Sequence, residues 1–199
     1  MIEVEKKFLL TEEEKQRLLK DAQFLVEKVF TDVYYDTSDW SLTRKDVWLR
    51  RRGNNYELKV PVNYDIYSKG HVLDQYREFE TVEGITEFLN LFIPKGSSLE
   101  EILEKAGYKT FCTLTTTRKK YIKDGYNIYL DYVDFGYTIA EIELMVSDES
   151  EVSKATDNIL DFAKSHGMSI SKVRGKVAEF LSRYSPVHFE VLQKAGVFY

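Results

Sequence analysis

The sequence predicts an α+β fold, in which one antiparallel sheet system of about eight strands carries helices on its outside. Several segments alternate apolar and polar residues with the period of two that is typical of half-buried strands. Short turns that contain glycine join many of these segments, and such hairpins place neighbouring strands antiparallel. A chain of 199 residues is long enough to bury one core, so we expect a single domain over residues 1–199.

The first predicted strand, Ile2–Phe8, places Ile2, Val4 and Lys6 on one side and charged residues on the other. The remaining predicted strands are Val29–Tyr35, Val47–Arg52, Tyr56–Pro61, Gln75–Val82, Thr113–Lys123, Tyr126–Asp134 and Thr138–Val146. The polar stretch Asn63–Val72 is expected to be a loop.

Helices are predicted between the strands. Thr11 with Glu14, and Ser98 with Glu101, are spaced as capping boxes, which satisfy backbone donors at a helix start. The predicted helices are Glu12–Lys20, Ile85–Phe92, one that follows Ser98 and ends near Gly107, Glu151–His166, Lys172–Tyr184 and Pro186–Lys194.

Composition excludes several classes of protein. The net charge of −5 lacks the basic excess typical of nucleic-acid binders. A single cysteine, Cys112, rules out a disulfide framework and a thiolate zinc site, and it favours a reducing, cytoplasmic compartment. No signal peptide, membrane-spanning run, P-loop or Rossmann motif is found. We expect a monomer that binds a small molecule, and neither nucleic acid nor a membrane.

Charged side chains of both signs occupy the strand faces opposite the apolar ones. They include Glu3, Glu5, Lys7, Arg50, Arg52, Glu57, Lys59, Glu78, Glu80, Arg118, Lys120, Asp131, Glu141 and Glu143. One interpretation is a solvated outer sheet face, which antiparallel sheets commonly have. The other is the lining of an interior cavity, if the sheet closes, and Trp48 on the charged side favours it. Carboxylates are ligands for Mg²⁺ or Mn²⁺, and arginine and lysine bind phosphates, so such a cavity would suit a metal and a polyphosphate.

Several motifs together resemble one family. Residues 3–7, EVEKK, match the ExExK signature found near the N-terminus of the CYTH superfamily, the triphosphate tunnel metalloenzymes. Further matches follow in order: VYYDT (33–37), WLRRR (48–52), ELKVP (57–61), TTRKK (116–120), LDYVDFGYTIAEIE (130–143) and GKVAEFL (175–181). Within the superfamily the chain is similar chiefly to the animal-type thiamine triphosphatases.

The resemblance implies an eight-stranded antiparallel tunnel that holds a triphosphate with Mg²⁺, or with Mn²⁺, and hydrolyses its terminal phosphate. The implied metal ligands are Glu3, Glu5, Asp131, Glu141 and Glu143. The implied triphosphate ligands are Lys7, Arg50, Arg52, Lys59, Arg118 and Lys176. Lys176 lies on a predicted helix, so it is expected to reach in from one end. Glu78 either joins the metal ligands or forms a structural ion pair with a tunnel base.

Roles in catalysis and substrate choice also follow from the resemblance. Lys7 and Tyr34 are implied to activate the attacking water, with the lysine lowering the pKa of the tyrosine so that it acts as a base. Trp48 is implied to stack on the thiamine ring. Where the animal enzymes carry a second acid two residues before the aspartate, this chain has Tyr129.

Three other functions stay open at this point. An inorganic triphosphatase would use the same sheet residues and differ only around Trp48. A nucleotidyl cyclase has less support, because no adenine-directed motif is found. A non-catalytic polyphosphate binder is disfavoured by the full set of carboxylates, which weaken anion binding unless metals occupy them.

Overall fold

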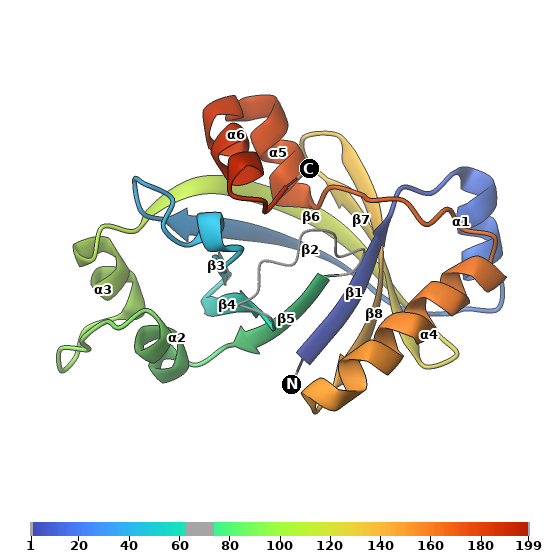
Figure 1. Ribbon diagram of the computed structural model, residues 1–199, viewed down its shortest axis with the longest axis horizontal. Coiled ribbons are helices and arrows are strands. Elements are labelled where there is room, and N and C mark those ends of the chain that lie inside the picture. The colour runs from blue at the N-terminus through green and yellow to red at the C-terminus, as the bar shows by residue number, and fades with distance from the viewer. Residues whose placement is uncertain (1, 63–73, 199) are drawn as a thin grey trace.

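The structure is a computed structural model that describes residues 2–62 and 74–198. The stretch Asn63–Val72, with its expected loop, lies outside the described residues. Eight strands in the described part form a closed antiparallel barrel in the order β1-β5-β4-β3-β2-β6-β7-β8 (Figure 1). Their bounds are β1 Ile2–Phe8, β2 Gln23–Asp36, β3 Trp48–Arg52, β4 Asn55–Pro61, β5 Asp74–Phe79, β6 Lys109–Lys123, β7 Tyr126–Val133 and β8 Tyr137–Val146. The predicted fold class is confirmed.

The first strand closes the barrel. It pairs with β5 on one side and with β8 on the other, and the second pairing sets Glu5 opposite Glu143 and Lys7 opposite Glu141. The charged faces of two strands far apart in the sequence therefore lie side by side on the same surface of the barrel wall.

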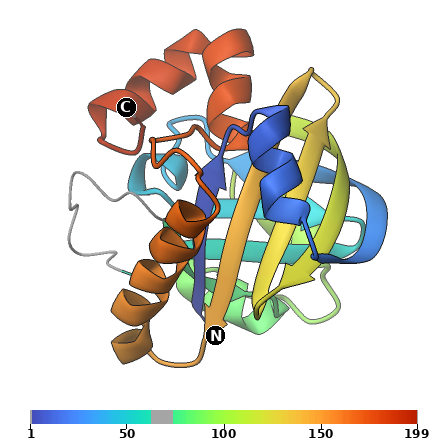
Figure 2. The same ribbon diagram turned by 90° about the vertical axis from the view of Figure 1, so that its right-hand side faces the viewer.

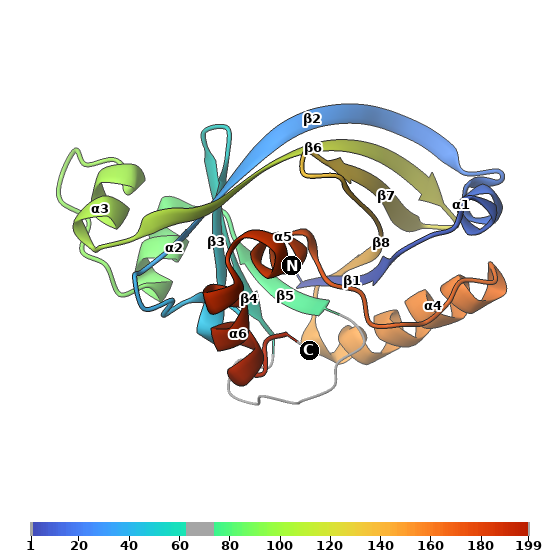
Figure 3. The same cartoon turned by 90° about the horizontal axis from the view of Figure 1, so that it is seen from above.

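The longest strands, β2 and β6, begin earlier than predicted, and they pair with each other from Gln23 opposite Ile122 to Asp36 opposite Lys109. In Figure 3 they arch together along one side of the barrel. The start of β2 gave no period-two signal, because Phe24 and Leu25 are consecutive apolar residues that both stay exposed.

Six helices are found in the described ranges. They are α1 Glu12–Leu19, α2 Val82–Phe88, α3 Leu99–Lys105, α4 Val152–Ser165, α5 Lys176–Tyr184 and α6 Pro186–Lys194, with 3-10 turns η1 at Thr43–Lys45 and η2 at Glu149–Glu151. The two predicted capping boxes, at Thr11 and Ser98, are both formed. None of these helices is long and apolar enough to cross a bilayer.

The helix predicted over Lys172–Tyr184 begins only at Lys176. The residues before it run in irregular backbone against β1, where the Lys6 ammonium donates a hydrogen bond to the Ser171 carbonyl. In a longer helix the Ser171 carbonyl would instead accept a hydrogen bond from a backbone N–H of the first helical turn.

Much of the hydrophobic core lies outside the barrel wall. Val4, Ile128 and Ile142 are almost wholly buried, and they pack with Ile159 of α4. Figure 2 shows α4 running along β1 and β8, with α5 and α6 at the top of the barrel. Because the helices cover the apolar outer faces, the charged faces of the same strands point inward.

The last helix is anchored by a buried polar chain. The Thr43 hydroxyl donates to Asp36 at 2.7 Å, so it accepts from His188 Nε2 at 3.0 Å. Trp40 stacks on the His188 ring with 4.6 Å between the ring centroids. Burial lowers the pKa of His188 to about 4, so the imidazole is neutral at physiological pH. Helix α6 is thereby fixed to the segment that leads into β3.

The buried histidine predicts a loss of stability in acid. In the unfolded chain His188 takes up a proton near pH 6.5, whereas in the folded chain it stays neutral down to about pH 4. Between these values the free energy of unfolding should fall by about 1 kcal/mol per pH unit. Thermal unfolding of the wild type and of His188→Gln should show this extra decline in the wild type only. Parallel pH profiles would contradict the assignment.

Candidate active site in the barrel

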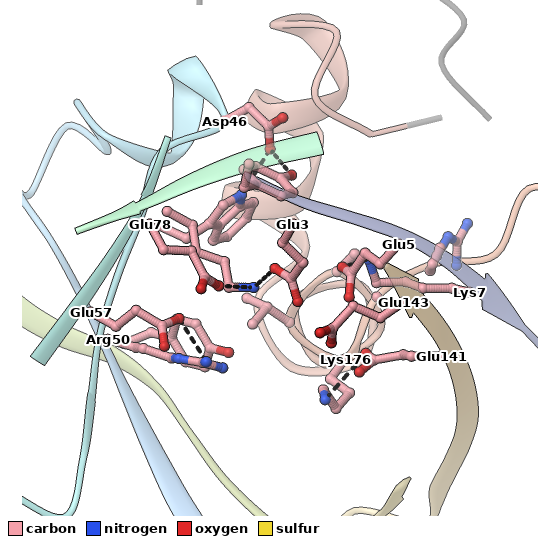
Figure 4. A pocket seen from close by; sticks show the side chains of 18 of the residues that line it. Glu3, Glu5, Lys7, Asp46, Arg50, Glu57, Glu78, Glu141, Glu143 and Lys176 are labelled. Atoms are coloured by element: carbon pink, nitrogen blue, oxygen red, sulfur yellow. Dashed lines mark hydrogen bonds and ion pairs between the residues drawn. The ribbon is translucent and has the colours of Figure 1, made fainter. Parts of the chain in front are cut away.

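The barrel encloses a cavity of about 310 Å³, and most of the predicted site residues line it. Those that do are Glu3, Glu5, Lys7, Tyr34, Trp48, Arg50, Lys59, Glu78, Arg118, Glu141, Glu143 and Lys176. Figure 4 shows the labelled side chains of this group pointing into the same pocket. Two of the predicted residues, Arg52 and Asp131, are not among the residues that line it. Of the two interpretations of the charged faces, the interior cavity is therefore correct.

Ion pairs run across the barrel between strands. Lys59 of β4 contacts both Glu3 and Glu78, the latter at 2.8 Å. Lys7 contacts Glu5 at 2.6 Å on the same strand. In the described part of the chain, seven carboxylates and six cationic side chains line the cavity. The site is thus nearly balanced in charge, as burial requires.

Asp131 holds two of the cations in place. Its carboxylate has no exposed surface, and it accepts two hydrogen bonds from Arg118, both at 2.6 Å, and a third from Lys176. Arg118 also donates to Glu141 at 2.5 Å. Asp131 therefore orients the two bases from behind, and Lys176 does reach in from the start of α5 as expected. Its implied role as a metal ligand stays a prediction.

A second buried carboxylate, Asp32 of β2, has the same role for two further arginines. It accepts from Arg52 at 2.7 and 2.8 Å and lies 3.6 Å from Arg50. The guanidinium of Arg52 also stacks on Phe30, 3.7 Å from the ring centroid. The sequence analysis missed Asp32, although its position two residues before Tyr34 on one strand would have placed both on the same face.

Arg50 has a donor that no side chain satisfies. It contacts Glu57 at 2.6 Å through one terminal nitrogen. Its Nε is buried and has no hydrogen-bond partner among the described residues. A buried donor without an acceptor is costly unless a ligand supplies one. An anionic oxygen in the cavity would do so.

The carboxylates divide into two groups by pKa. Burial raises the pKa of Glu143 to about 8, and the neighbouring charges of Glu3 and Glu5 add to the rise. Burial also raises the pKa of Glu5 to about 7, against the opposing effect of Lys7. For Glu141 burial acts in the same direction, but Lys176 and Arg118 outweigh it and hold the pKa below its usual value.

This donor set fits a hard divalent cation. Glu3, Glu5 and Glu143 face one region of the cavity, and the pKa of Glu3 is likewise raised by burial. Three crowded carboxylates with raised pKa values lack enough positive charge nearby, which a metal ion would supply. A second carboxylate group, Glu57, Glu78 and Glu80, has oxygens within 4.8 Å of one another. Glu78 thus lies both in this group and in an ion pair with Lys59.

The expected lowering of the Tyr34 pKa is wrong in direction. Burial raises the pKa of Tyr34, Asp32 adds to the rise, and Arg50 opposes it. Among the charged neighbours, the Asp32 carboxylate, which the sequence analysis missed, therefore has the largest effect on the pKa of Tyr34. Tyr34 remains protonated at neutral pH and can donate a hydrogen bond into the cavity.

Tyr129 takes part in the site through its ring. The Arg118 guanidinium lies 4.3 Å from the centroid of the Tyr129 ring, within the range of a cation–π contact. At this position the chain thus supplies a ring that stacks on Arg118, and it supplies no acid.

One end of the cavity is aromatic. The Trp48 indole N–H donates to Asp46 at 2.8 Å, and the Tyr76 hydroxyl donates to the same oxygen at 2.9 Å. Phe198 stacks on Trp48 with 5.9 Å between ring centroids and 19° between the planes. The sequence analysis missed Asp46 and Phe198, because neither shares a strand face with the charged residues.

Known proteins resemble this chain over most of its length. A family model described as the CYTH domain matches residues 1–175. The thiamine-triphosphatase of Homo sapiens is 29% identical over 213 residues, which cover 96% of this chain and 89% of the human protein. The thiamine-triphosphatase of Macaca fascicularis is 28% identical over 211 residues, with the same shares.

Solved structures share the fold. A Pyrococcus horikoshii protein superposes with a TM-score of 0.61 at 22% identity, covering 91% of this chain and 99% of its own. A putative adenylate cyclase from Vibrio parahaemolyticus gives 0.61 at 19%, with shares of 92% and 98%. A putative adenylyl cyclase from Hippeastrum, described as having a dominant triphosphatase activity, gives 0.55 at 19%, with shares of 92% and 95%.

The two neighbouring glutamates of β8 should respond oppositely to removal of their charge. Glu143 resists ionisation in the folded state, so the metal-free wild type loses stability relative to Glu143→Gln as the pH rises from 5 to 8. Glu141 is stabilised as an anion, so Glu141→Gln should be the less stable protein at pH 8. We expect each difference to be roughly 1–3 kcal/mol in thermal unfolding with EDTA present. Shifts of the same sign would contradict the pKa assignment.

Proposed function

Because the chain belongs to the CYTH family, we propose that it is a metal-dependent triphosphatase that hydrolyses thiamine triphosphate to thiamine diphosphate and phosphate. The Nε of Arg50 carries the proposal most directly, since it is a buried donor without an acceptor, on a side chain that lines the cavity. The thiamine-triphosphatases at 29% and 28% identity support the choice of substrate.

The phosphate chain would lie among the bases that line the cavity. Of the six cationic side chains there among the described residues, those we propose are Lys7, Arg50, Lys59, Arg118 and Lys176. Arginine binds phosphate oxygens through paired N–H groups, and lysine contributes a point charge. Asp131 behind Arg118 and Lys176, and Asp32 behind Arg50, hold these cations in fixed orientations before the substrate arrives. Arg52 would act through Asp32 at a greater distance.

The carboxylates with raised pKa values would hold the metal. Glu3, Glu5 and Glu143 are the ligands we propose. Glu141 and Asp131 are further candidates from the family pattern, and Glu78 is a candidate from its place in the cavity. Bound Mg²⁺ or Mn²⁺ would neutralise phosphate charge and polarise the phosphorus–oxygen bonds. Because metal and triphosphate have opposite charges, both can enter the balanced cavity together.

Hydrolysis requires a water molecule in line with the terminal phosphorus. The oxygen of this water bonds to phosphorus as the bond to the bridging oxygen breaks, and the proton of the water passes to a phosphate oxygen of the products. The cationic side chains stabilise the negative charge on the equatorial oxygens and on the departing bridging oxygen. Lys7 and Tyr34 line the cavity, and we propose that they orient the terminal phosphate and the water. Since its pKa is raised, Tyr34 would serve as a hydrogen-bond donor and not as the base.

The second candidate is an inorganic triphosphatase, which the charged end of the cavity would serve equally well. The aromatic end favours a substrate with a ring, because Trp48 lines the cavity and its indole N–H is held by Asp46. A cyclase finds no specific support in the cavity.

The test is phosphate release by the purified protein. Thiamine triphosphate and inorganic triphosphate are each supplied with Mg²⁺ or with EDTA. We expect Mg²⁺-dependent release with a higher kcat/KM for the thiamine ester. A higher kcat/KM for inorganic triphosphate would contradict the assignment of thiamine triphosphate as the substrate. No phosphate release from either compound would refute the proposed triphosphatase activity.

Two adjacent arginines provide a matched pair of variants. Arg50 faces the cavity, whereas Arg51 lies on the outer face and donates to the Tyr35 hydroxyl and the Gly53 carbonyl. Arg50→Gln should lower kcat/KM roughly 100-fold for both triphosphates, the usual scale for one lost transition-state donor. Arg51→Gln should leave it within a few-fold of the wild type. Similar losses in both variants would show that the cavity is not the site of hydrolysis.

Replacing Trp48 should separate the two substrates. Trp48→Ala removes the stacking surface, so KM for thiamine triphosphate should rise about tenfold while KM for inorganic triphosphate stays constant. Steady-state phosphate release measures both. An equal effect on the two KM values would mean that Trp48 only packs the barrel mouth.

A further inference from the structure

The chain beyond α6 turns back to form part of the cavity wall. Val197 and Phe198 both line the cavity, at the end that also holds Trp48 and Asp46. Neither residue belongs to the charged strand faces that would bind the phosphate chain and the metal. Their position points to the part of a ligand that extends beyond the phosphates.

A helix-ending turn directs these two residues inward. Gly196 has a φ of +81°, its N–H donates to the Gln193 carbonyl at 3.0 Å, and the Val197 N–H donates to the Leu192 carbonyl at 3.0 Å. This is the Schellman pattern that ends many helices, and it needs a left-handed residue at the glycine. Since α6 is itself fixed to η1 through His188 and Thr43, the turn is anchored at its base.

The turn places the Phe198 ring between two others. Phe198 stacks on Trp48 at 5.9 Å and, with 5.5 Å between centroids and 26° between planes, on Phe189 of α6. Trp48 is therefore held along its edge by Asp46 and on its ring by Phe198. A 5.9 Å separation leaves no room for another ring between Trp48 and Phe198, because two stacked layers need about 7 Å.

We propose that Phe198 is a specificity-determining residue that completes, with Trp48, an aromatic subsite for the planar ring of a ring-bearing triphosphate. This inference rests on the proposed function. Phe198 keeps the indole of Trp48 in one orientation. The binding of a substrate ring therefore does not have to include the entropic cost of immobilising the indole. Its ring adds to the same wall of the cavity as Trp48. The ion pairs that hold the phosphate-binding bases, such as Lys59 with Glu78 and Arg118 with Asp131, do not involve it.

Three variants test this role. Phe198→Ala removes the ring, and Phe198→Tyr keeps it. Gly196→Ala strains the turn, because alanine disfavours the positive φ at this position. The added Cβ would meet no atom within 4 Å, so the strain comes from the backbone alone and no side chain in the cavity changes. Phe92→Ala is the matched control, since Phe92 is 84% exposed and does not line the cavity.

Phosphate release is measured from thiamine triphosphate and from inorganic triphosphate. In Phe198→Ala and Gly196→Ala, KM for the thiamine ester should rise roughly three- to tenfold, the scale of one aromatic contact. KM for inorganic triphosphate and both kcat values should stay within twofold, and Phe198→Tyr should retain wild-type KM. Equal changes for both substrates would overturn the proposal, as would a lower KM for the thiamine ester, which would show that the tail obstructs the ring.

Binding without turnover separates this inference from the proposed function. Dissociation constants for both compounds are measured by calorimetry in EDTA, for the wild type and Phe198→Ala. If the wild type hydrolyses neither compound, a selective loss of thiamine triphosphate binding in Phe198→Ala still supports the subsite. If the wild type hydrolyses the ester and Phe198→Ala keeps the wild-type ratio of the two dissociation constants, the role of Phe198 is refuted while the proposed function stands. A wild type that neither hydrolyses nor binds either compound, with Mg²⁺ as well as in EDTA, refutes both.

Discussion

Burying charge inside a closed barrel is the constraint on which the rest of this structure depends. Each ion taken out of water costs several kcal/mol unless an opposite charge compensates it. The strands meet this constraint by placing bases beside acids across the wall, as Lys59 does with Glu3 and Glu78. Compensation is incomplete around Glu5 and Glu143, where burial raises the pKa values. The carboxylates around Glu5 and Glu143 would thus be stabilised by a cation, and the unsatisfied Arg50 donor would be stabilised by an anion.

Two buried carboxylates that do not line the cavity give the site its rigidity. Asp131 joins β6 to α5 by binding Arg118 and Lys176, so the helix that closes the barrel end is tied to the base it delivers. Asp32 of β2 holds Arg52 and Arg50 of the neighbouring strand β3. Truncating either aspartate would leave buried cations unpaired, which is more damaging than losing one exposed ion pair. Because these cationic side chains are already in place, they need to move little when negative charge develops on a substrate.

Much of this arrangement could be predicted from local patterns, and the exceptions have physical causes. Period-two alternation located the strands and showed that Glu141 and Glu143 share a face, and capping boxes located helices at Thr11 and Ser98. Family resemblance was needed for Lys176, because a helix residue shows no strand periodicity. Asp46 and Phe198 escaped prediction because they reach Trp48 only through tertiary folding, after turns in which Asp46 and Gly196 adopt positive φ. The direction of the Tyr34 pKa shift depended on burial, which a sequence does not show.

The central claim is that metal and triphosphate bind the cavity cooperatively because each supplies the charge that the other needs. Calorimetric titration with a non-hydrolysable imido analogue of triphosphate, with and without Mg²⁺, measures this coupling without turnover. The account predicts that Mg²⁺ tightens binding of the analogue at least tenfold, and that the analogue tightens binding of Mg²⁺ by the same factor. An affinity for the analogue that Mg²⁺ leaves unchanged or weakens would contradict it.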